Sequence, residues 1–221
     1  GGVSVLALSG TALGGCMAAR GADGVAGAPA PSGAPMALIS PDEKLDEIAY
    51  KMLAQEPGRA TGLGVDTGDY ADWRGTWGAP GNAGREAYRN VLTELVEDAR
   101  SYPKEGLTAD QQVGFEVVET AFSSAREGMA LPYGDVAVGS WRNAPYVVIQ
   151  NVGGYLDYPR AMGAGQPVKT TQDAEFFMAR LAEIPAALDG ELERVKEARA
   201  FGVITPDILH DNAIKQKELT A

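Results

Sequence analysis

The strongest constraint on the fold is that apolar residues recur at helical spacing in four separate segments of the chain. In the first segment they lie at positions i, i+3, i+4, i+7 and i+8, which places them on one face of a helix. These residues are Leu45, Ile48, Ala49, Met52 and Leu53. Ser40 is suited to the N-cap before them, and Glu43 completes a capping box. No segment sustains the period-two alternation of a strand, so the sequence predicts an all-α or nearly all-α fold.

Three further helices are predicted from the same spacing, with apolar faces in residues 88–99, 115–129 and 177–195. A last helix is predicted to start at Thr205-Pro206-Asp207. The face in residues 177–195 continues through Pro185, where we expect a kink or two helices in line. The charged residues of that helix are expected to form its solvent-exposed side: Glu191, Glu193, Arg194, Lys196, Glu197 and Arg199.

Residues 58–84, between the first two predicted helices, are rich in glycine and acidic residues and are predicted to form a long loop. A loop of this length in a compact domain is usually functional or is held by its own side chains. Trp73 and Trp77 lie in this segment, and they either fix it to the protein surface or contact a ligand. The residues alone leave both roles open.

The charge of the chain excludes some classes of function. It contains 30 acidic and 19 basic residues, a formal net charge of -11, and the acidic residues are spread along its length. Nucleic-acid binding requires a basic face, so we expect no nucleic-acid partner. With one cysteine and one histidine, the chain cannot form an internal disulfide or supply two histidines to a metal site. His210 is therefore predicted to be an exposed helix residue, and no metal ligand is expected in this chain.

Residues 1–19 contain no charge and are predicted to be the apolar part of a truncated export signal. The run Leu13-Gly14-Gly15-Cys16 resembles a bacterial lipobox, whose cysteine is acylated and becomes the mature N-terminus. In the alternative, an ordinary signal peptidase removes the segment and Cys16 has no role. Residues 20–39, rich in glycine, alanine and proline, are predicted to form a disordered tether, because they cannot bury enough apolar surface to fold. The folded helical region is expected over residues 40–221.

The densest cluster of polar residues lies in residues 131–162, on an otherwise apolar and glycine-rich background. Burying such groups unpaired costs about 1–3 kcal/mol each, so they are either hydrogen-bonded inside the fold or exposed in a cleft. Pro145 is expected to start a helix over residues 146–155, with Gln150 and Asn151 on one face. That face either lines a cleft or forms an amide network with another helix. The candidates for a substrate cleft are Tyr133, Trp141, Arg142, Asn143, Gln150 and Asn151.

Arg142 carries a permanent charge and must therefore meet water, a carboxylate or a ligand. Asp135 and Asp157 are carboxylates of the same stretch, and we expect one of them to pair with Arg142. A carboxylate of a substrate is the alternative partner. The chain contains no phosphate-binding loop and no nucleophile-elbow motif, so no catalytic residue is predicted in it.

The segment PYGDVAVGSWRNAPYVVIQNVGGYLDYPR, residues 132–160, resembles the N-terminal half of a bacterial family called domain of unknown function 885. The segments SPDEKLDEIAYKMLAQEPGRATGLGVDTG and DAEFFMARLAEIPAALDGELERVKEARAFGVITPDILHD resemble the helices before and after it, so the resemblance extends from about Ser40 to the last residue. Members of this family are similar to zinc metallopeptidases of the gluzincin type. The resemblance implies a zinc ion in the full-length protein, held by an H-E-x-x-H helix downstream of this chain.

These observations predict the N-terminal fragment of an exported, lipid-anchored, metallopeptidase-like hydrolase of the periplasm or outer membrane. Its expected partners are the C-terminal catalytic half of the same protein and a peptide-like substrate, with membrane contact only through the anchor. Since the resemblance implies a core shared between two halves, we expect the last helices to expose apolar surface and the isolated fragment to associate. The alternative is a non-enzymatic helical lipoprotein that serves as a binding module of the cell envelope.

Overall fold

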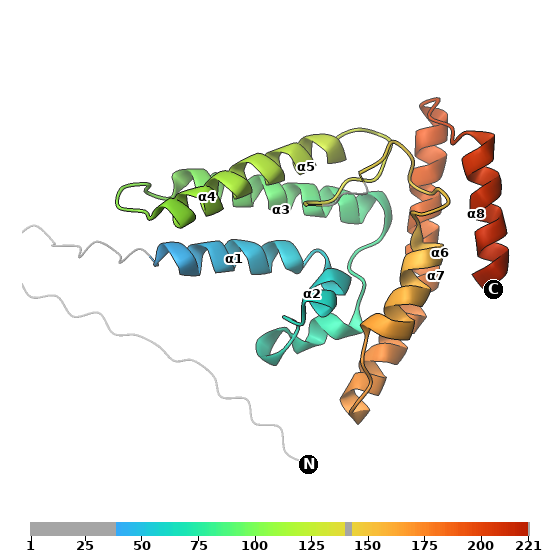
Figure 1. The fold of residues 1–221 in the computed structure, drawn as a ribbon, viewed down its shortest axis with the longest axis horizontal. Helices are drawn as coiled ribbons and strands as arrows, with labels where there is room; N and C mark the ends of the chain where they lie inside the picture. The colour runs from blue at the N-terminus through green and yellow to red at the C-terminus, as the bar shows by residue number, and fades with distance from the viewer. Residues whose placement is uncertain (1–38, 140–142, 221) are drawn as a thin grey trace, which may run out of the picture. The chain divides into compact units, whose positions relative to one another are not determined.

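The computed structural model describes residues 39–139 and 143–220, which belong to the compact unit Ile39–Ala221 (Figure 1). The predicted signal segment with Cys16 and the tether up to residue 38 lie outside the described residues, as do Trp141 and Arg142. The described part of the chain forms the helices α1 to α8 and contains no β-strand, which confirms the predicted all-α class.

The apolar core is enclosed by α1 (Pro41–Leu53), by α3 (Gly81–Ser101) and by a rod made of α4 (Ala109–Val117) and α5 (Ser123–Met129), which run alongside one another (Figure 1). A π-helical turn, η2 (Val118–Phe122), joins α4 to α5. The buried side chains belong to the predicted apolar faces: Ile48, Met52, Leu53, Tyr88, Leu92, Leu95, Val96, Ala99, Phe115, Val118, Phe122, Ala125 and Met129. The structure thus confirms these three faces.

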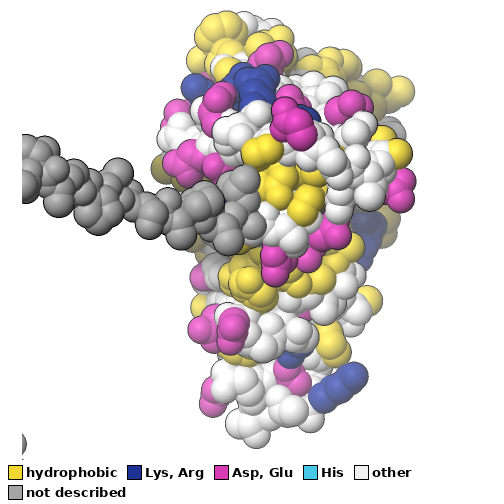
Figure 2. Space-filling view, turned by 90° about the vertical axis from the view of Figure 1, so that its left-hand side faces the viewer, with side chains coloured by type: hydrophobic (Ala, Val, Ile, Leu, Met, Phe, Trp, Pro, Cys, Tyr) yellow, Lys and Arg dark blue, Asp and Glu magenta, His cyan; other side chains and the backbone are white. Residues whose placement is uncertain are grey.

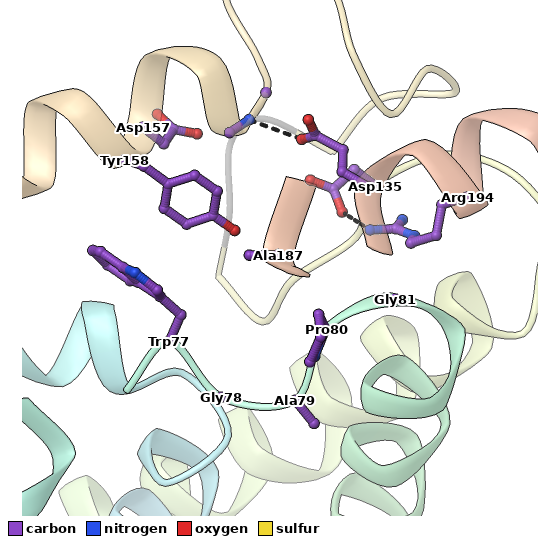
Figure 3. A pocket seen from close by; sticks show the side chains of 13 residues that line it. Trp77, Gly78, Ala79, Pro80, Gly81, Asp135, Asp157, Tyr158, Ala187 and Arg194 are labelled. Atoms are coloured by element: carbon purple, nitrogen blue, oxygen red, sulfur yellow. Dashed lines mark hydrogen bonds and ion pairs between the residues drawn. The ribbon is translucent and has the colours of Figure 1, made fainter. Parts of the chain in front are cut away.

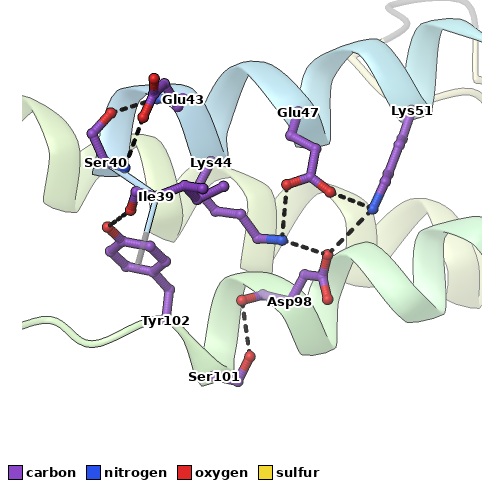
Figure 4. A network of polar contacts seen from close by, with 9 residues as sticks. All are labelled: Ile39, Ser40, Glu43, Lys44, Glu47, Lys51, Asp98, Ser101 and Tyr102. Atoms are coloured by element: carbon purple, nitrogen blue, oxygen red, sulfur yellow. Dashed lines mark hydrogen bonds and ion pairs between the residues drawn. The ribbon is translucent and has the colours of Figure 1, made fainter. Parts of the chain in front are cut away.

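Polar contacts fix α1 against α3. The predicted capping box forms at the start of α1, where the backbone N of Glu43 donates to Ser40 Oγ at 3.3 Å and the backbone N of Ser40 donates to Glu43 Oε2 at 2.9 Å. Further along α1, Lys44 Nζ donates to Asp98 Oδ2 of α3 at 2.8 Å (Figure 4). Exposed ion pairs contribute at most about 1 kcal/mol each. The apolar core therefore stabilises the pair of helices, and the charges set their orientation.

The prediction of a long loop over residues 58–84 is wrong. The segment contains α2 (Pro57–Leu63), the 3-10 helix η1 (Gly68–Gly75) and the start of α3. Pro57 begins a helix here because its fixed φ suits the first helical position and its missing N–H is not needed there. Gly64 ends that helix in the left-handed conformation, at φ 71°.

Aromatic stacking holds η1 against α1. Tyr50 and Tyr70 stack with their ring centroids 4.4 Å apart, and Trp73 packs on Tyr70 at 4.6 Å. Trp73 also packs against the buried core. Trp73 therefore fixes this segment to the fold, which is one of the two roles that the sequence left open.

The prediction of a helix over residues 146–155 is also wrong. Ile149 and Val152 exchange backbone hydrogen bonds of 2.9 and 3.2 Å around a tight turn. Gly153 then adopts φ 141°, a conformation outside the helical region, and only afterwards does α6 (Gly154–Arg160) begin. The β-branched residues before the turn and the permissive glycine after it favour this extended path over a helix.

The longest helix, α7 (Thr171–Ala200), continues as one element through Pro185. It contacts η1, α3 and α6, and α8 (Asp207–Thr220) packs against α6 (Figure 1). Thr170 caps α7 with a capping box, and α8 begins where the sequence predicted. In the described residues, α6 and α7 are therefore joined to the helical core chiefly through the η1–α3 segment.

The predicted solvent-exposed side of α7 is wrong for two residues. Glu191 and Arg194 turn inward and line a pocket with α6. By contrast, apolar side chains of α7 and of the segment that follows it are exposed: Met178, Leu181, Leu188, Leu192, Phe201, Ile204, Ile208, Ile214 and Leu219. This exposure agrees with the expectation that the last helices present apolar surface, and association of the fragment stays a prediction.

The acidic side chains are dispersed over the surface that Figure 2 shows. Figure 2 shows Asp and Glu side chains scattered over one face among hydrophobic and neutral groups, with Lys and Arg between them. A basic patch of the kind that nucleic acids require is not visible on this face. Among the helices that the structure describes, none is both long and apolar enough to span a membrane.

Candidate functional site

A pocket of about 250 Å³ lies where the segment before α3, the turn at Asp135, α6 and α7 meet (Figure 3). Its wall combines small residues, which leave the space open, with charged and aromatic side chains that face into it. The lining residues are Trp77, Gly78, Ala79, Pro80, Gly81, Asp135, Gly153, Gly154, Asp157, Tyr158, Ala187, Glu191 and Arg194. The pocket is large enough for one amino-acid side chain or a comparably small group.

One wall is held in place by bonds to α7. The backbone N of Trp77 donates to Glu183 Oε2 at 2.7 Å, and its indole Nε1 donates to the carbonyl of Arg180 at 3.0 Å. Further along, Gly81 and Gly190 touch so closely that a Cβ on Gly190 would lie 2.5 Å from the backbone N of Gly81. Trp77 is thus fixed to the fold and also lines the pocket.

Glu191 is the most unusual group in the pocket. Its Oε1 accepts a hydrogen bond from the backbone N of Gly154 at 2.8 Å. No Lys or Arg in the described part of the chain forms an ion pair with it. Burial raises the pKa of the Glu191 carboxyl above its ordinary value, and the nearby charges of Asp135 and Asp157 act in the same direction. The hydrogen bond from Gly154 and the charge of Arg194 lower this pKa, but burial outweighs them.

The other charged groups of the pocket are engaged. Arg194 Nη1 donates to Asp135 Oδ1 at 3.0 Å, and its Nη2 donates to the carbonyl of Gly134. Tyr158 lies against Trp77, with ring centroids 5.0 Å apart. Burial and the charge of Glu191 raise the pKa of the Tyr158 phenol to about 12. The phenol is consequently a neutral hydrogen-bonding group at physiological pH.

The four predicted cleft residues that the structure describes, Tyr133, Asn143, Gln150 and Asn151, do not line this pocket. Tyr133 is half-buried in the turn before it, and Asn151 is exposed. Asn143 Oδ1 accepts from the backbone N of Ala137 at 3.2 Å, and Gln150 Oε1 accepts from Asn212 Nδ2 of α8 at 2.8 Å. Gln150 thus forms a side-chain hydrogen bond with another helix. This is the alternative to a cleft that the sequence left open.

Trp141 and Arg142 lie outside the described residues, so the proposed clustering of Trp141, Arg142, Asn143, Gln150 and Asn151 stays a prediction. Of the two carboxylates expected to pair with Arg142, Asp135 is bonded to Arg194. Asp157 lies 3.9 Å from Arg160 on α6. Both aspartates line the pocket.

Sequence reasoning missed Glu191, Arg194 and Tyr158. A signal was present on α7, because Ala187, Gly190, Glu191 and Arg194 recur at helical spacing. Small residues at such positions mark a side of a helix that another segment approaches closely. Charged residues on that same side must then meet partners or a ligand rather than bulk water.

The structure contains no metal site within residues 39–139 and 143–220, since no three His, Cys, Asp or Glu side chains there are grouped to hold an ion. His210 is exposed on α8, as predicted. The zinc implied by the family resemblance therefore does not fit the described residues of this chain.

Replacing Glu191 by glutamine is expected to stabilise the protein in a pH-dependent manner. Because the pKa of Glu191 is raised in the folded state, ionisation of this carboxyl lowers the free energy of unfolding. This destabilisation is absent below the unfolded pKa of about 4.5 and grows as the pH rises through the folded pKa. Glutamine keeps the oxygen that accepts from Gly154. Thermal melts should therefore coincide near pH 4 and show a higher Tm for Glu191→Gln at pH 8. A lower Tm of the variant at pH 8 would contradict the assignment.

Together the fold and the site define an acidic, all-helical bacterial domain with a small carboxylate-lined pocket beside its longest helix. The chain belongs to the family described as "Bacterial protein of unknown function (DUF885)", which matches residues 57–221. No curated protein matches the chain, and no solved structure matches it.

Proposed function

We propose that this chain is the N-terminal helical part of an exported, lipid-anchored, zinc metallopeptidase-like hydrolase that cleaves peptide or amide bonds. Membership of the family and the resemblance of residues 132–160 support this proposal. The described residues supply no zinc ligands, so the metal would be held by another part of the protein. When bound, such a zinc ion lowers the pKa of water and supplies the nucleophile.

The observation that carries the proposal is the exposed face of α7. Over residues 176–188 the exposed side chains of this helix are all apolar, and they include Met178 at 60 %, Leu181 at 44 % and Leu188 at 37 % exposure. Burying a leucine or methionine side chain is worth about 1.5–3 kcal/mol, so a helix face of this kind is favoured when another apolar surface covers it. A catalytic half packed on α7 would provide that surface and would lie next to the pocket.

The proposal is tested by comparing this chain with the complete product of its gene. Zinc content is measured by elemental analysis, and hydrolysis is measured on a library of unstructured peptides with and without a chelator. We expect the 221-residue chain to bind no stoichiometric zinc and to cleave nothing, and the complete protein to do both.

Two outcomes would overturn the proposal. Stoichiometric zinc on the 221-residue chain itself would contradict the assignment of the metal to another part of the protein. A complete gene product that binds no zinc and cleaves no peptide would favour the alternative, a non-enzymatic binding module of the cell envelope.

A further inference from the structure

We draw no further inference here: the strongest candidate, the exposed apolar face of α7 at Met178, Leu181, Leu188 and Leu192, already supports the proposed function, and nothing in residues 39–139 and 143–220 shows what covers it.

Discussion

Replacing Arg180 by alanine is expected to lower the free energy of unfolding by about 3–5 kcal/mol, which corresponds to a fall in Tm of roughly 10 °C. Arg180 is 1 % exposed, and its guanidinium donates to groups of three separate segments. The acceptors are the carbonyl of Thr76 at 2.9 Å, Gln166 Oε1 at 3.1 Å, Thr61 Oγ1 at 2.8 Å and the carbonyl of Trp73 at 2.9 Å. The guanidinium also lies 4.6 Å from the centroid of the Trp77 ring.

The size of this effect follows from what the substitution leaves behind. Without Arg180, the two backbone carbonyls in and after η1 lose a charged donor in a place that water does not reach, at a cost of about 1–3 kcal/mol each. The stacking on Trp77 is lost as well. Relief of the desolvation that lowers the pKa of Arg180 offsets part of this loss.

Two further variants make the Arg180 prediction specific. Arg180→Lys keeps the charge but not the planar fork of donors, so it should lose most of the same stability. Arg199→Ala removes an exposed arginine from the last turn of the same helix and should change the free energy of unfolding by less than about 0.5 kcal/mol. Urea unfolding of the chain measures all three. A loss for Arg180→Ala no larger than that for Arg199→Ala would refute the structural role.

The second large effect is expected in the helical core. Phe115→Ala should cost about 3–5 kcal/mol, because the ring is 1 % exposed and its removal leaves a cavity. Tyr102 stacks on this ring, with the two ring centroids 4.8 Å apart. Lys104, on the loop that leads to α4, places its Nζ 4.2 Å from the centroid of the Phe115 ring. The substitution therefore weakens the contact of this loop as well as the core.

The control for Phe115 lies on the same helix. Val117 is 56 % exposed, so Val117→Ala removes apolar atoms without opening a cavity, and we expect a change of less than about 0.5 kcal/mol. The two variants are compared by their midpoints of denaturant unfolding, provided that the dependence of the unfolding free energy on denaturant concentration is the same for both. A similar loss of unfolding free energy for both variants would show that the Phe115 ring contributes no more to the core than an exposed side chain does.

The predictions from sequence succeeded where the local pattern and the tertiary environment agree. The capping box at Ser40 formed as the residue spacing required, because a cap is satisfied by atoms only three residues away. The apolar faces of α1, α3 and the α4–α5 rod are buried for a similar reason, since 3.6-residue periodicity aligns them on one side.

The predictions failed where the same residues permit two local structures. Pro57 begins a helix in the segment where a loop was predicted to start, because proline suits the first turn of a helix as well as the position after its end. Pro145 was expected to begin a helix, yet the chain after it turns back at Ile149 and Val152. Neither choice follows from propensity alone, because packing against η1 and α8 decides it.

The sequence by itself determined the helical class, the positions of the caps, the acidic charge and the shortage of metal ligands. Only the tertiary structure decided which side of α7 meets the protein, since its leucines and its charged residues both recur at helical spacing. The structure turns Arg180 and Glu191 inward and leaves Leu181 exposed. The physical reason is that the groove beside η1 and α3 offers carbonyls, an amide N–H and glycine backbone, which suit polar side chains better than leucine.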